Sequence, residues 1–157
     1  MGDISFDTLY QKSLLIKRTD IVEEVVKYKL SQEQQIEYLK KLGELKFEKE
    51  DCLIHRYDKE LSDFKLVLYM VKVPKIKDSV DTDISLYLEY DYRTAILLIN
   101  ENENGYSTID NILAFQNENI ELVEEKYNSL YKQVSEQSDE EIINIINDYI
   151  DNEISKN

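Results

Sequence analysis

The sequence predicts an α+β protein with an N-terminal helical cluster, a three- to four-stranded and mainly antiparallel sheet, and C-terminal amphipathic helices. Apolar residues recur at helical spacing between residues 5 and 42 and again between residues 120 and 150. Between residues 64 and 99 they instead alternate or run together, as they do in half-buried and fully buried strands. The change of period from helix to strand and back to helix favours this class over all-helical and all-β folds.

Length and composition favour one domain with a conventional hydrophobic core. The chain has 157 residues, of which 42% are hydrophobic and 33% are charged, as in ordinary globular proteins. No internal repeat and no stretch of simple composition indicates a second domain. We therefore predict a single domain over residues 1–157, in which 1–45 is helical, 46–100 forms the sheet and 106–154 is helical and acidic.

Cysteine content and hydropathy favour a reducing compartment. Cys52 is the only cysteine, so the chain cannot form an intramolecular disulfide. The first ten residues lack the basic start and apolar run of a secretory leader, and no apolar stretch approaches the ~20 residues that span a bilayer. Ile, Asn, Lys, Glu and Tyr are abundant and have AT-rich codons, which favours a bacterial or phage genome. We expect the cytoplasm of a bacterial host cell, without membrane association.

Three helices are predicted in the N-terminal part. Ser5–Arg18, Ile21–Leu30 and Ser31–Leu42 each carry apolar residues at roughly helical spacing. Ser31 followed by Gln34 forms a capping-box pattern, and Gly43 can end the third helix. These segments form the predicted helical cluster.

The predicted strands are Phe64–Met70, Ile84–Tyr90 and Thr94–Ile99, with Cys52–Tyr57 as an ambiguous fourth. Asp91–Arg93 is interpreted as a reversal that joins the last two strands into a hairpin. Ala95–Ile99 is apolar without alternation, which predicts a central strand covered on both faces, with helices on both sides of the sheet. Glu101–Gly105 is predicted to be a turn.

The C-terminal part is predicted to be helical. Thr108 can cap a short helix that runs through Phe115. From Ile120 to Val134 a narrow apolar stripe predicts a longer amphipathic helix. Ser138 with Glu141 forms a second capping box before a last amphipathic helix.

Charge is distributed unevenly along the chain. Residues 1–77 contain 15 Lys and Arg against 14 Asp and Glu, whereas residues 78–157 contain 4 against 19. The formal net charge of −14 therefore belongs to the second half. Such a field repels phosphates and attracts basic proteins, so we expect no direct binding of nucleic acid by this half. The alternative is that the charge only aids solubility.

Motifs for catalysis and cofactor binding are weak. Cys52 and His55 have the spacing of half a zinc site, but the chain has one Cys and one His, so carboxylates would have to complete the site. Asp58, followed by Asp63 and Lys65, is a loose imitation of a metal-dependent nuclease motif. The three glycines are too scattered to form a phosphate-binding loop. We therefore expect no catalytic residue, no metal, no cofactor and no enzymatic activity.

Two features favour an interaction surface, namely Leu122 on the helix from Ile120 and an aromatic and acidic mixture around the predicted hairpin and its exit turn, formed by Tyr87, Glu89, Tyr92 and Tyr106. For the tyrosines, packing in the core or on the sheet face is the alternative. Leu122 falls opposite the apolar stripe among acidic residues, so it is interpreted as an exposed anchor, with packing against a neighbouring loop or helix as the alternative. On the last helix no cation lies among the outward acids, so these acids are expected to be displayed rather than paired. The predicted partner-binding residues are Glu121, Leu122, Glu124, Glu125, Glu140, Asp148 and Asp151.

These observations favour a non-enzymatic acidic inhibitor or binding protein. Its expected partner is a basic protein that handles nucleic acid, such as a nuclease or a CRISPR effector, whose nucleic-acid site it occludes as a DNA mimic. Phage anti-defence proteins of the anti-CRISPR or antirestriction type and immunity proteins against nuclease toxins are the biological classes that fit. A small carboxylate-based enzyme, with or without a metal, and a structural or scaffold protein remain alternatives, and a homodimer is left open.

Overall fold

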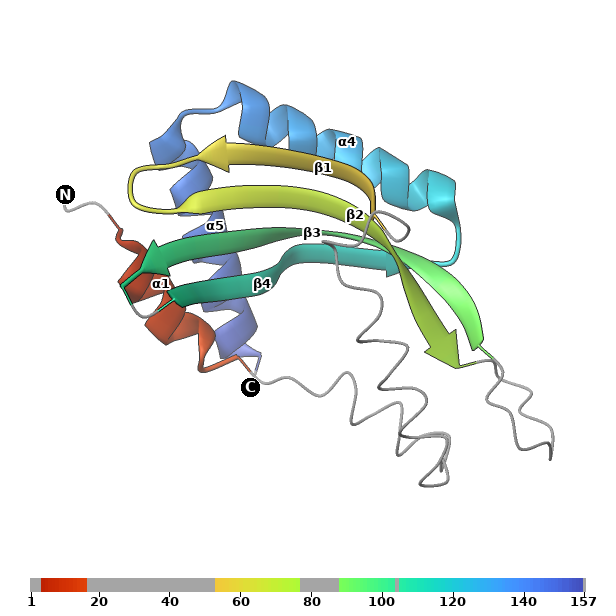
Figure 1. Cartoon of the computed structure of the whole chain (residues 1–157), viewed down its shortest axis with the longest axis horizontal. Coiled ribbons are helices and arrows are strands. Elements are labelled where there is room, and N and C mark those ends of the chain that lie inside the picture. The colour runs from red at the N-terminus through yellow and green to blue at the C-terminus, as the bar shows by residue number, and fades with distance from the viewer. Residues whose placement is uncertain (1–3, 17–52, 77–87, 104, 157) are drawn as a thin grey trace.

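The computed structural model describes residues 4–16, 53–76, 88–103 and 105–156. The described elements are α1 (Phe6–Ser13), β1 (Leu53–Glu60), β2 (Lys65–Ile76), β3 (Leu88–Asn102), β4 (Gly105–Asn117), α4 (Ile120–Glu136) and α5 (Asp139–Ser155). The four strands form one antiparallel sheet in the order β1-β2-β3-β4, and α4 and α5 pack on one of its faces (Figure 1). The predicted α+β class is confirmed.

The middle of the sheet is buried on both faces. On β2, Leu66 and Leu68 join a core shared with α1, α4 and α5, while Val67 and Tyr69 belong to a cluster on the opposite face. The alternation follows from the pleat, which points successive side chains to opposite faces. We call the face that carries the three described helices the helix face and the other one the second face.

Strand β3 confirms the prediction of a central strand. It lies between β2 and β4, and its residues 95–98 are buried in turn on the second face and the helix face. The sequence also predicts helices on both sides of the sheet. The three helices that the structure describes all contribute to the core on the helix face. The helices predicted over 21–30 and 31–42 lie outside the described residues, as do Cys52 and the first residues of the predicted strand 84–90.

Helix α4 begins and packs as the sequence predicts. Asn119 caps it, because its Oδ1 accepts a hydrogen bond of 2.9 Å from the Glu121 N–H. The apolar stripe buries Val123, Tyr127, Leu130 and Val134 against the sheet.

A lysine from β1 stabilises the end of α4, whose last turn contains no basic residue. Lys59 Nζ donates hydrogen bonds to the carbonyls of Val134, at 2.8 Å, and Gln137, at 3.4 Å. A cation at this position satisfies carbonyls that have no partner within the helix and complements the negative end of its dipole.

Ser138 caps helix α5 as predicted, but Glu141 accepts from the Ser138 hydroxyl instead of from its backbone N–H, so the capping box is incomplete. The Glu141 N–H donates to Ser138 Oγ at 3.2 Å, and Ser138 Oγ donates to Glu141 Oε1 at 3.2 Å. Four isoleucines of α5 are buried in the helix-face core, namely Ile142, Ile143, Ile146 and Ile150. The Tyr149 hydroxyl donates to the Asn111 carbonyl at 3.1 Å, which joins α5 to β4.

The predicted reversal at Asp91–Arg93 is wrong, because β3 continues through these residues. They pair with β2 on one side, where Val73 lies opposite Asp91, and Arg93 pairs with β4 on the other. The Asp91 carboxylate also accepts a 3.0 Å hydrogen bond from Gln116 Nε2. Polar side chains typical of a turn are therefore accommodated within a long strand.

The short helix predicted over Thr108–Phe115 is also wrong, because these residues lie in β4. The register passes from Leu98 opposite Ile109 to Ile96 opposite Ile112, so β4 has one extra residue at this bulge. Two bulges are accompanied by positive φ angles of 61° at Asn111 and 53° at Leu113. The bulges bring apolar residues three positions apart to one face, a spacing that imitates a helix. The sheet thus extends to residue 117, within the part predicted to be helical.

Replacing Lys59 with Met tests the bridge from β1 to α4. The change keeps an unbranched apolar stem but leaves two carbonyls without their charged donor, so we expect a loss of about 1–2 kcal/mol in the free energy of unfolding. Urea denaturation measures it. Lys132→Met, at an exposed position on α4, is the control and should change stability by less than about 0.5 kcal/mol. Equal effects of the two substitutions would contradict the assigned role of Lys59.

Candidate functional site

The first two turns of α4 display three of the predicted partner-binding residues. Glu121, Leu122 and Glu125 are all exposed, and Leu122 exposes 45% of its surface. No ion pair involves either glutamate within the described part of the chain. The prediction that Leu122 lies outside the packed stripe therefore agrees with the structure, whereas its role as an anchor for a partner stays a prediction.

Glu124 differs from its neighbours because it has an internal partner. Its Oε1 lies 3.2 Å from Nε2 of His55 on β1. The His55 ring also stacks on Tyr127, with a 5.0 Å distance between ring centroids. Glu124 therefore helps to hold α4 against β1 and is a weaker candidate for a partner contact than Glu121 and Glu125.

The predicted acids of α5 also divide into two kinds. Glu140 and Asp148 are exposed and have no ion-pair partner among the described residues. Asp151 forms an ion pair with Lys12 of α1, whose Nζ also donates a 2.7 Å hydrogen bond to Asn147 Oδ1. The expectation that the acids of this helix are displayed rather than paired is wrong for Asp151, because a lysine distant in sequence packs beside it.

The predicted residues do not form one continuous surface. Glu121 and Glu125 lie at the start of α4, whereas Glu140 lies just beyond its end, and a 17-residue helix separates them by about 25 Å. Figure 1 shows α5 leaving the end of α4 and crossing behind the sheet toward the C-terminus. Asp148 lies eight residues beyond Glu140 on α5, about 12 Å along the helix. The acidic surface therefore has an α4 group and an α5 group.

An aromatic cluster between β1 and α4 was not predicted. Tyr131 contacts Tyr57 edge-to-face at 4.8 Å between ring centroids and lies 6.5 Å from the Tyr127 ring. Burial, together with the neighbouring Tyr131, raises the pKa of Tyr127. Tyr131 exposes 43% of its surface and lies at the edge of the apolar stripe of α4. The edge position of Tyr131 in the stripe is the sequence signal that could have predicted its partial exposure, because edge positions of a helix face are half-exposed.

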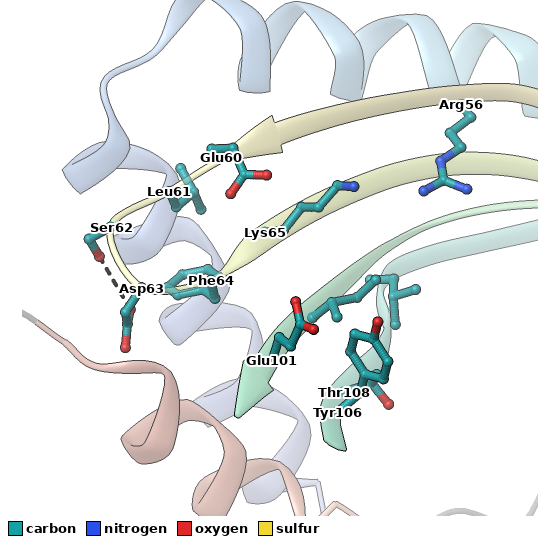
Figure 2. A pocket seen from close by; sticks show the side chains of 12 residues that line it. Arg56, Glu60, Leu61, Ser62, Asp63, Phe64, Lys65, Glu101, Tyr106 and Thr108 are labelled. Carbon is teal, nitrogen blue, oxygen red and sulfur yellow. Dashed lines mark hydrogen bonds between the residues drawn. The ribbon is translucent and has the colours of Figure 1, made fainter. Parts of the chain in front are cut away.

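A cavity of about 740 Å³ lies over the second face, at the end near the β1–β2 loop (Figure 2). Its lining residues come from all four strands and from that loop, namely Arg56, Glu60, Leu61, Ser62, Asp63, Phe64, Lys65, Leu97, Ile99, Glu101, Tyr106 and Thr108. The loop is fixed by a 2.9 Å hydrogen bond from the Leu61 N–H to the Phe64 carbonyl, and by a 2.7 Å hydrogen bond from Asn100 Nδ2 to the Asp63 carbonyl.

Both cations of this cavity are bound to Asp58. Arg56 donates to the two oxygens of Asp58 at 2.8 and 3.1 Å, and Lys65 Nζ lies 2.7 Å from Oδ2. The hydrogen bond from Arg56 lowers the pKa of Asp58, burial opposes that shift, and Lys65 adds to it. Asp58 thus stays ionised and reduces the positive field that Arg56 and Lys65 project into the cavity.

Within the described part of the chain, no group of three His, Cys, Asp or Glu side chains is arranged to hold a metal ion. His55, the only histidine, is engaged with Glu124 and Tyr127. None of the described helices combines the length and the apolar character that crossing a bilayer requires. The search of protein-family models, of curated proteins and of solved structures finds no match to this chain.

The two kinds of acid on α5 should respond oppositely to neutralisation. Asp151→Asn removes the ion pair with Lys12, so we expect a loss of about 0.2–1 kcal/mol in the free energy of unfolding at low salt. Asp148→Asn removes one charge from a chain of net charge −14 without breaking a pair, so stability should stay constant or rise. Urea denaturation of both variants measures the difference, and equal changes would contradict the assigned pairing.

Asp58→Asn should alter the acid dependence of stability. The folded-state pKa of Asp58 lies below its ordinary value of 3.8, so its contribution is present above that value and is lost as pH falls through the folded pKa. The variant should therefore be less stable than the natural chain at about pH 6, and the difference should shrink as pH falls below the ordinary pKa of 3.8. Denaturation midpoints across this range test the expectation. A difference that does not change with pH would contradict it, and Glu103→Gln in the β3–β4 turn is the control.

Proposed function

We propose that this chain is a non-enzymatic binding protein that docks its C-terminal helices onto a basic nucleic-acid-handling protein, such as a nuclease or a CRISPR effector, and blocks its nucleic-acid site. The observation that carries the proposal is that four of the predicted partner-binding carboxylates on α4 and α5 are exposed and have no ion-pair partner among the described residues. These are Glu121, Glu125, Glu140 and Asp148. They belong to a half-chain with 19 acidic and 4 basic residues.

Rigid support favours a docking role for these helices. Both helices are capped, and each buries four apolar residues in the helix-face core. Carboxylates on such a scaffold lose little conformational freedom when they meet a partner, which lowers the entropic penalty of binding. The folded chain therefore presents its acidic residues in a fixed arrangement.

Apolar anchors accompany the α4 group. Leu122 and Tyr131 are nine residues apart, which is about two and a half helical turns, so their side chains leave α4 in opposite directions. They lie on the two flanks of its exposed side. Glu121 and Glu125 lie between these flanks. Charge speeds the encounter with a basic partner, and buried aromatic or aliphatic side chains prolong the complex.

The proposed mechanism is occlusion. Carboxylates of α4 and α5 occupy positions in a cationic groove that phosphates otherwise fill, so nucleic acid and this chain compete for one site. Phage anti-defence and toxin-immunity proteins act in the bacterial cytoplasm, which is where we place this chain.

Capture from a bacterial lysate on the immobilised chain, followed by mass spectrometry, tests the proposal. The expected result is a basic nucleic-acid-binding protein that a short DNA duplex releases at constant ionic strength. A captured protein that DNA does not release, or an empty capture, would overturn it.

Charge-neutral variants then identify the docking helix. We compare Glu121→Gln/Glu125→Gln on α4 with Glu140→Gln/Asp148→Asn on α5, and use Asp7→Asn/Glu103→Gln as a control with the same loss of charge elsewhere. Neutralising the docking helix should slow association with the captured protein about tenfold at low salt, and the control should slow it much less. Equal slowing in all three variants would show that net charge, not these helices, governs the association.

A further inference from the structure

The cavity on the second face has no part in the proposed docking of α4 and α5. The register of the sheet arranges its floor as two rows. The first row, across the four strands in order, is Glu60, Lys65, Ile99 and Thr108, and the second places Glu101 beside Tyr106. Four strands span about 14 Å, so the cavity is long enough for an extended small molecule.

Two carboxylates in this cavity have no partner among the described residues. Lys65 lies next to Glu60 across the sheet, but its ammonium group binds Asp58 instead. Glu60 and Glu101 are both exposed, and neither forms an ion pair with a residue that the structure describes. Figure 2 shows the two carboxylates pointing toward one another across β2. Asp63, a third carboxylate of the lining, accepts a 3.3 Å hydrogen bond from Ser62. Arg56 and Lys65 share the single carboxylate of Asp58. Glu60 and Glu101 are therefore the two carboxylates of the cavity that are left without a hydrogen bond or an ion pair among the described residues.

An apolar and aromatic surface accompanies these carboxylates. Ile99 is partly exposed on the floor, and Tyr106 exposes 70% of its surface directly across from Glu101. A tyrosine ring beside a carboxylate is a favourable site for an alkylammonium group, because both attract the cation while the ring also contacts its methylene groups. The cavity thus combines two anionic points with an apolar path.

We propose that this cavity binds a linear polyamine, with terminal ammonium groups at Glu60 and Glu101 and methylene groups against Ile99 and Tyr106. The two glutamates are two strands and two residues apart, which places their Cα atoms about 12 Å from each other. An extended triamine can bridge that separation. A single divalent cation cannot, because its oxygen ligands must lie within about 2.0–2.6 Å of the ion.

Titration calorimetry of the full chain with the triamine spermidine tests this site. We expect one molecule bound per chain at about physiological salt, and Glu60→Gln/Glu101→Gln should weaken the affinity about tenfold or more. The control, Glu140→Gln/Asp148→Asn, removes the same charge from α5 and should change the affinity less than about twofold. Tyr106→Ala should weaken binding about threefold or more through loss of the ring contact.

Several outcomes would overturn the proposal. Equal weakening by the two charge-neutral pairs would show that spermidine binds only as a counterion of an acidic chain. If Mg²⁺ at the same concentration of charge displaced spermidine as well as unlabelled spermidine does, binding would again be that of a counterion. No binding at about 1 mM spermidine would exclude the site. Because docking of α4 and α5 is measured with different variants, either proposal can fail while the other stands.

Discussion

Strands β2 and β3 pair along the whole 12-residue length of β2, and in their middle both faces of the pair are buried. Because successive side chains point to opposite faces, such a pair needs cover on each side. On the helix face that cover is provided largely by α4 and α5, whose apolar stripes must turn toward the sheet. Their polar sides are then directed outward. The position of the acidic surface is therefore a consequence of packing at the centre of the sheet.

Basic residues of the nearly neutral first half bind and stabilise the helices of the acidic second half. Lys12 pairs with Asp151 of α5, and Lys59 binds the carbonyls at the end of α4. These contacts compensate charge where the helices must be held. They leave Glu121, Glu125, Glu140 and Asp148 exposed. Similar compensation occurs in the cavity, where Arg56 and Lys65 bind Asp58. There Glu60 and Glu101 have no partner among the residues that the structure describes. Both proposals rest on this division between paired and unpaired carboxylates.

Local patterns predicted the elements whose side chains keep a regular period. The Ser138 N-cap, the isoleucines of α5 and the central strand 95–99 all follow from spacing along the chain. Patterns failed where the backbone is irregular or where polar residues are paired across strands. Bulges at Asn111 and Leu113 give β4 a helix-like spacing, and pairing on both sides holds Asp91–Arg93 in a strand. Neither effect is visible without the neighbouring strand.

The amino-acid sequence is enough to predict the fold class, the amphipathic helices at the C-terminal end and the charge of the half-chain that contains them. All of these depend on residue type and local spacing. Local spacing does not show which carboxylates of the described residues are paired, because Lys12 lies far from Asp151 in sequence, as His55 does from Glu124. The tertiary structure shows these pairs. It also decided that Glu60, Glu101 and Tyr106 share one cavity, since strand register brings them together. Contacts between residues distant in sequence leave no periodic pattern along the chain. These contacts decide which side chains are available to a partner and which ones stabilise the fold.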